Sequence, residues 1–141
     1  MKRVLPLLTG GILAIAWCQG GDLVQQAPPR AADRSSPLVA NGRTLQAGAK
    51  LYTRECAACH GAKREGLGKA PPLDGAEVNR APAGALFWVV GNGSLRNGMP
   101  SFAHLPQQQR WQIVTWLLQS SGSGAEDHPI TGKRRTASSP K

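Results

Sequence analysis

The apolar residues of this 141-residue chain recur at helical spacing in three segments near its centre. In residues 42–57, apolar positions three and four apart form one line along one face of a helix. Residues 83–91 form a short second helix, which a Gly-Asn-Gly sequence at 91–93 ends. A third helix begins at Pro106, because proline is favoured in a first turn, and ends in the Ser/Gly run of 120–124. The pattern therefore predicts an all-α domain.

The segments between these helices, residues 61–82 and 92–105, are rich in glycine and proline and do not alternate as strands do. Loops of this length are unusual in so small a domain unless they pack against something other than their own side chains. A covalently held macrocycle would give helices and loops one large apolar body to pack on, as a domain with a small core requires. The loops therefore favour a cofactor at the centre of the domain.

The two ends of the chain differ in composition from this centre. Residues 1–20 have a basic start, small residues at the end, and between them an apolar run shorter than the roughly 20 residues of a bilayer span, as export signals have. Residues 21–37 have the composition of a flexible linker, and residues 120–141 that of a disordered basic tail. The folded domain is therefore expected to span residues 38–119.

Cys18 lies directly after the apolar run, where lipoprotein signals are cut and acylated. Those signals carry a small residue before the cysteine, whereas Trp17 occupies that position here. We therefore expect Cys18 to leave with the signal, and a lipid anchor at Cys18 is the alternative. In both cases the protein is predicted to be exported to the periplasm.

Cys56, Cys59 and His60 form a C-x-x-C-H motif, the pattern of covalent c-type haem attachment. The two thiols add to the two vinyl groups of the macrocycle, and the histidine that follows lies under the iron. A zinc site needs four ligands and a thioredoxin-like pair needs a parallel sheet, and the sequence offers neither. A disulfide would leave His60 without a role. The motif predicts one covalent haem c with His60 as proximal iron ligand, oriented by a carbonyl of segment 70–75.

Met99 is the only methionine outside the predicted export signal. A lone methionine is often core filler, but Gly98 and Pro100 hold this one in an irregular loop. We therefore predict Met99 as the distal ligand of the iron. His104 and His128 are rival sixth ligands, and their simpler interpretations are an exposed loop histidine and a solvated tail residue.

These features together resemble the class I c-type cytochromes over about residues 38–119. In that family the first helix carries glycine, an aromatic residue and the first haem cysteine at intervals of four, as Gly48, Tyr52 and Cys56 do here. The last helix carries an aromatic residue that crosses the first helix at the glycine. Trp116 looks like its counterpart, although tyrosine is commoner in the family.

The resemblance implies a class I cytochrome c fold, with three main helices and long Gly/Pro-rich loops wrapped around one covalent haem c. It also implies that the carbonyl of Pro71 orients His60 and that Met99 is the axial methionine. Residues 86–93 and 98–102 are similar to the small cytochromes that serve periplasmic dehydrogenases and oxidases. Four-helix-bundle cytochromes are disfavoured, because a loop and another helix follow the haem motif here.

One haem with two candidate axial ligands predicts one-electron transfer, as a periplasmic carrier or an electron-transfer subunit, and no enzymatic activity of the chain itself. The alternative is a small haem peroxidase, or a haem-based gas or redox sensor with a displaceable Met99. A peroxidase would need an open sixth position or a second haem, together with a distal acid–base residue, whereas the sequence offers one C-x-x-C-H motif and a candidate sixth ligand.

The formal net charge is +9, to which the predicted signal contributes only Lys2 and Arg3. Basic residues gather in the tail and around the haem motif, where they are Arg43, Lys50, Arg54, Lys63, Arg64 and Lys69. A basic surface raises the rate of encounter with acidic partners. We therefore expect a redox protein with an acidic docking face, and no nucleic acid, because no recognition motif accompanies the charge.

Overall fold

A computed structural model describes residues 22–122 of the chain, and within that range it contains seven α-helices and no β-strand. The elements are α1 (Asp22–Gln25), α2 (Pro29–Ala32), α3 (Gly42–Glu55), α4 (Ala57–His60), α5 (Ala76–Arg80), α6 (Ala83–Asn92), the 3-10 helix η1 (Leu95–Asn97) and α7 (Gln107–Gly122). The three predicted helices correspond to α3, α6 and α7, so the all-α fold class is confirmed. No helix in the described part of the chain is long and apolar enough to cross a membrane.

The predicted export signal, Cys18, His128 and all but the start of the predicted tail lie outside the described residues. The start of that tail does not match its assignment, because α7 continues through residues 120–122. Ser120 Oγ donates to the carbonyl oxygen of Trp116 at 2.7 Å, and this local hydrogen bond is compatible with helix.

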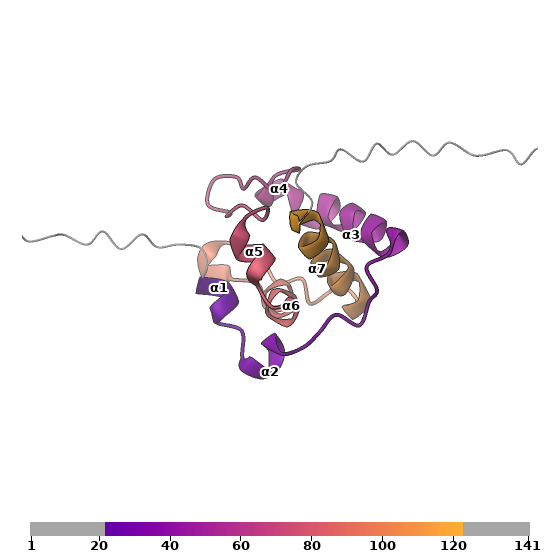
Figure 1. The fold of residues 1–141 in the computed structure, drawn as a ribbon. Helices are drawn as coiled ribbons and strands as arrows, with labels where there is room; N and C mark the ends of the chain where they lie inside the picture. The colour runs from indigo at the N-terminus through magenta and orange to yellow at the C-terminus, as the bar shows by residue number, and fades with distance from the viewer. Residues whose placement is uncertain (1–21, 123–141) are drawn as a thin grey trace, which may run out of the picture.

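The two long helices α3 and α7 pack against each other at an angle (Figure 1), and they form the largest contact between helices in the described part of the chain. A β-carbon at Gly48 would overlap the backbone oxygen of Gln112 on α7 and crowd the side chain of Trp116. Only glycine therefore allows the two backbones to approach this closely. Trp116 in turn packs against Tyr52 of α3, with ring centroids 4.7 Å apart. This is the helix crossing that the family resemblance implied.

The core lies between α3, α6 and α7. α6 is apolar on most of its surface, as expected of a helix that is covered on several sides. Its Phe87 stacks on Trp111 of α7 with ring centroids 4.2 Å apart, and Ile113 and Val114 are completely buried beside them. Each fully buried side chain of this kind contributes about 1.5–3 kcal/mol to folding.

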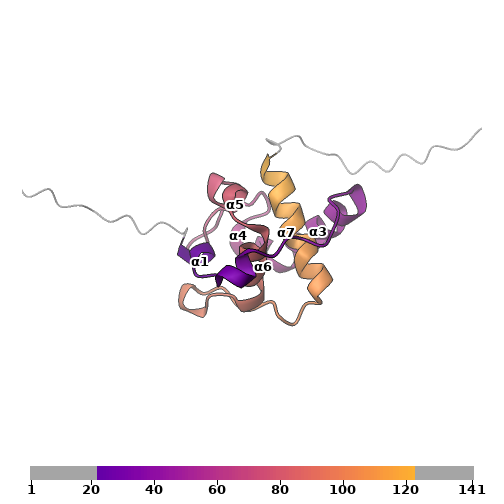
Figure 2. The ribbon, with the colours of Figure 1, turned by 60° about the horizontal axis from the view of Figure 1, so that its bottom comes forward.

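Residues 22–37, for which the composition predicted a flexible linker, are packed against the domain instead. α1 and α2 both contact α6, and Ala27 between them is 8% exposed. Figure 2 shows α2 lying over α6. The sequence pattern missed this packing because α2 meets Gly84 through backbone carbonyls, which leave no hydrophobic period in the sequence. The packed unit therefore begins before residue 38.

Candidate functional site

An apolar cavity of about 440 Å³ lies between the end of α3, α4, the loop that follows α4, α6 and the loop before α7. Its volume is within the range of pockets that hold small molecules and cofactors. Most of its lining is apolar, and the aliphatic side chains include Leu67, Leu73, Val78, Leu86, Val89, Val90, Ile113 and Leu117. Cys56, Cys59, His60, Pro71 and Met99 also line it, so the structure brings all five predicted site residues to one cavity.

The haem motif occupies the bend between α3 and α4. α3 ends at Glu55 with Cys56 as its C-cap, and one further turn of helix follows, in which His60 N donates to Cys56 O at 2.9 Å. Residues three and four positions apart on a helix share a face, so Cys56, Cys59 and His60 all point to the same side. Gly61 ends the turn with a φ of 81°, in a region that side-chain-bearing residues rarely adopt.

The two cysteines differ in their surroundings. Cys56 is half-buried and Cys59 is exposed, and both are free thiols. Burial, and then the nearby Glu55 and Cys59, raise the pKa of Cys56 to about 12. The Cys56 thiol of the unmodified chain is therefore neutral at physiological pH.

His60 is held by a carbonyl of the proline segment. Its Nδ1 lies 2.8 Å from the carbonyl oxygen of Pro71. Because a carbonyl oxygen can only accept, Nδ1 carries the proton and Nε2 keeps its lone pair. Nε2 is therefore the nitrogen available to a metal, in the arrangement usual for metal-binding histidines.

The loop after α4 is tied to the rest of the domain at both ends. Tyr52 Oη donates to Gly61 O at 2.7 Å from inside the core. Arg64, the only non-glycine residue with a positive φ in residues 22–122, accepts from Leu73 N at 2.7 Å through its own carbonyl. Its guanidinium lies over the Trp116 ring and donates to Ser120 O at 3.0 Å. In the sequence, Arg64 stands out only as one of the basic residues near the haem motif, and no motif marks it as a structural residue.

Met99 lies in a tight loop fastened to α6. Ser94 N donates to Met99 O at 2.8 Å and Met99 N donates to Ser94 O at 3.0 Å, which closes the loop across Gly98 in a left-handed conformation. Ser101 Oγ donates to Gly91 O at 2.5 Å. These bonds place the partly buried Met99 at the cavity wall. The rival residue His104 is exposed and does not line the cavity.

A family model described as cytochrome C oxidase, cbb3-type, subunit III matches residues 43–117, which is more than half of the chain. The chain belongs to this family. The predicted resemblance to class I mono-haem c-type cytochromes is thereby confirmed. No curated protein and no solved structure matches the chain significantly.

As a cytochrome c domain, the protein binds one covalent haem c, as the sequence predicted. Cys56 and Cys59 lie within the matched residues and fit the attachment motif. The geometry suits this cofactor, because the two thiols stand at an apolar cavity beside a histidine whose Nε2 has no hydrogen-bond partner in the described region. A large apolar ring in the cavity would also cover the apolar side chains that the loop after α4 and the Met99 loop turn toward it.

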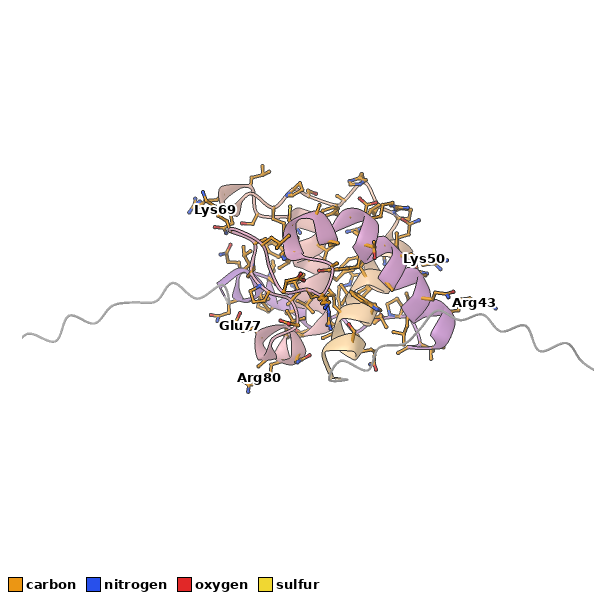
Figure 3. The ribbon with its side chains drawn as sticks, turned by 90° about the horizontal axis from the view of Figure 1, so that it is seen from above. Arg43, Lys50, Lys69, Glu77 and Arg80 are labelled. Carbon is orange, nitrogen blue, oxygen red and sulfur yellow. The ribbon has the colours of Figure 1, made fainter. Side chains whose placement is uncertain are left out.

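Most of the basic residues in the described part of this cytochrome do not line the cavity. Arg43 and Lys50 lie along α3, away from Lys69, as Figure 3 shows. Among residues 22–122, Lys69 is the one basic side chain other than His60 at the cavity wall, where it is accompanied by Glu55 and Glu77. The charge surrounding the cavity is therefore mixed, although the chain as a whole is strongly basic.

Tyr52, the only tyrosine of the chain, gives a pH-dependent prediction. Burial, with a smaller contribution from Cys56, raises its pKa from 10.0 to about 12. The unfolded chain loses this proton near pH 10 while the folded domain keeps it. The stabilisation is therefore complete below pH 10 and is lost as the pH rises through about 12. In the haem-loaded protein the Cys56 contribution is absent, because the thiol has become a thioether, and burial still raises the pKa of Tyr52. We therefore expect the free energy of unfolding of that protein, measured with denaturant, to fall as the pH rises above 10.

Tyr52→Phe is the control for this titration. It removes the hydrogen bond to Gly61 O and leaves a buried carbonyl without its partner, so it should lower the stability at neutral pH by about 1–2 kcal/mol. It should also show a smaller alkaline loss than the parent. Ultraviolet detection of tyrosinate in the native protein near pH 10 would contradict the assigned environment of Tyr52.

Proposed function

We propose that this cytochrome is a periplasmic one-electron carrier, or an electron-transfer subunit, in which His60 and Met99 are the axial ligands of the haem iron. Membership of the family establishes haem-based electron transfer as the general function of the domain. The observation that supports the finer proposal is the shared cavity, to which α4 brings His60 and the closed Ser94–Met99 loop brings Met99.

The chain's own residues have separate tasks in this proposal. Cys56 and Cys59 hold the haem covalently, and Pro71 O keeps the imidazole of His60 in one orientation and one tautomer. The thioether of Met99 is a soft ligand, which favours ferrous iron and raises the potential relative to two histidines. The bound haem supplies the chemistry, a change of one electron between ferrous and ferric iron. No proton has to move for this transfer.

The rigid attachment of the Met99 loop supports a carrier. The loop is fixed at Ser94, and next to it Phe102 N donates to Val90 O at 3.0 Å, so Met99 is backed by bonds on both sides. A ligand held in one position changes little between the two iron states. The peroxidase or sensor considered from the sequence would need Met99 to leave, and no contact of the described residues favours that.

Met99→Ala tests the distal ligand. In haem-loaded protein we expect the variant to lose the far-red ferric band of iron–thioether ligation and to have a lower reduction potential, because a soft ligand is missing. His104→Ala is the matched control, since His104 is exposed in the same loop region and should leave both quantities unchanged. An unaltered band in Met99→Ala, or its loss in His104→Ala, would show that the ligand has been assigned wrongly.

We further propose that the partner is a redox protein with an acidic docking face, within an oxidase assembly or beside one. The family is named after an oxidase subunit, and the chain has a formal net charge of +9. Because the charges at the cavity wall are mixed, the attraction would come mainly from the net charge of the molecule, with Lys69 as the local contribution at the cavity wall.

The salt dependence of electron transfer tests this attraction without an identified partner. The rate of oxidation by the ferricyanide anion should fall as ionic strength rises, and the rate with a cationic cobalt ammine complex should rise, because salt screens opposite effects. Lys69→Gln should weaken the salt dependence of the rate with ferricyanide. Lys50→Gln should change this dependence less, because Lys50 lies on α3 away from Lys69. The reverse pair of salt dependences would exclude an acidic docking face.

A further inference from the structure

Part of the wall of the haem cavity comes from outside the region that the family model matches. Leu23 and Val24 of α1 line the cavity, whereas the match begins at residue 43. Both side chains are partly buried, and Val24 packs against the core cluster. α1 reaches this position because it lies against α6, whose Leu86, Val89 and Val90 line the same cavity.

The segment that carries α1 is seated on α6 at a glycine. A β-carbon at Gly84 would overlap the carbonyl oxygen of Ala31 and lie 2.7 Å from those of Ala32 and Arg34. The backbone of α2 therefore rests directly on α6, and it does so only because residue 84 has no side chain. Figure 2 shows this crossing, with α1 continuing from it along one side of α6.

Two further contacts hold the segment between α1 and α3 against α6 and α7. The guanidinium of Arg34 lies 4.9 Å from the ring centroid of Phe87 and 5.6 Å from that of Trp111, within the range of cation–π attraction. Ser36 Oγ and Thr115 Oγ1 of α7 are hydrogen-bonded at 3.0 Å. The segment is therefore held at several points between α1 and α3, and α1 is not a loose end that happens to lie near the cavity.

We propose that residues 22–38, here called the strap, are a functional wall of the haem site that excludes water from the cofactor and thereby raises its reduction potential. This inference rests on the proposed function, because it assigns the strap to the same haem. Leu23 and Val24 are the residues that would contact the cofactor. Gly84, Arg34 and Ser36 hold the strap without lining the cavity, and are positioning residues.

The expected effect follows from electrostatics. The iron carries one more positive charge when ferric than when ferrous, and that charge is less favourable where water is excluded. The apolar shell of a metal site controls its solvent access and dielectric, and hence its potential. Displacing the strap, or making its inner face polar, should therefore shift the potential downwards while both axial ligands stay in place.

Two kinds of variant test separately the contact of the strap with Gly84, here called its seat, and the side chains of Leu23 and Val24 that line the cavity. Gly84→Ala places a β-carbon against the α2 backbone. Because alanine favours the helical conformation more than glycine does, the substitution should not weaken α6 itself. Leu23→Ser with Val24→Ser leaves the seat intact and changes only the wall. Gly42→Ala is the matched control, because a β-carbon at the first residue of α3 meets no atom within 4 Å.

Three measurements are made on each haem-loaded full chain: the reduction potential, the far-red ferric band, and the rate of tryptic cleavage after Arg30 and Arg34, both exposed on the strap. We expect Gly84→Ala to lower the potential and to speed cleavage. Leu23→Ser with Val24→Ser should lower the potential, and Gly42→Ala should change neither. The far-red band should persist in all of them.

An unchanged potential in Gly84→Ala despite faster cleavage, or in the double serine variant, would overturn the inference. The outcome is separable from the ligand assignment, because a potential can be measured whatever the sixth ligand is. A downward shift in both variants would support the strap even in a protein whose parent lacked the far-red band. If the far-red band were present in every variant and no reduction potential shifted, the axial ligands would be supported and the strap would have no role at the haem site.

Discussion

The close approach of α3 and α7 at Gly48 is the constraint on which the rest of the domain depends. It brings Trp116 against Tyr52, whose hydroxyl binds Gly61 O at the end of the haem motif. A side chain at Gly48 would separate the helices and move Tyr52 together with the turn that carries Cys56, Cys59 and His60. Because close-packed interiors transmit small displacements, the geometry of this turn is set by a contact between two helix backbones.

The cofactor completes a core that the chain alone leaves open. The loop after α4 and the loop around Met99 present apolar side chains to a cavity rather than to one another. They keep their shape through backbone and charged contacts, with Arg64 bound to the end of α7 and Ser101 bound to α6. This division explains how loops rich in glycine and proline can hold Pro71 O beside His60 and keep Met99 at the cavity wall. The polar anchors fix the backbone, and the haem supplies the apolar surface for packing.

The helices and the haem motif could be predicted from the sequence because their signals are local: apolar spacing in α3 and α6, and the five residues from Cys56 to His60. The carbonyl beside His60 could be placed in residues 70–75 for a similar reason, since proline leaves that backbone few conformations. The strap and Arg64 could not be predicted, because they depend on contacts between distant residues through carbonyls and guanidinium groups. The charge at the cavity also could not be predicted, since residues near the motif in sequence, such as Arg43 and Lys50, lie along α3 rather than at the cavity.

The most direct test of the account is the absorption spectrum of the protein produced with a haem c maturation system, first native and then denatured. We predict haem that stays with the denatured chain, and a native ferric spectrum with the far-red band of iron–thioether ligation. That result would establish attachment through Cys56 and Cys59 and support His60 and Met99 as the axial ligands. Covalent haem with a high-spin native spectrum would contradict the Met99 assignment, and haem lost on denaturation would contradict the entire account of the site.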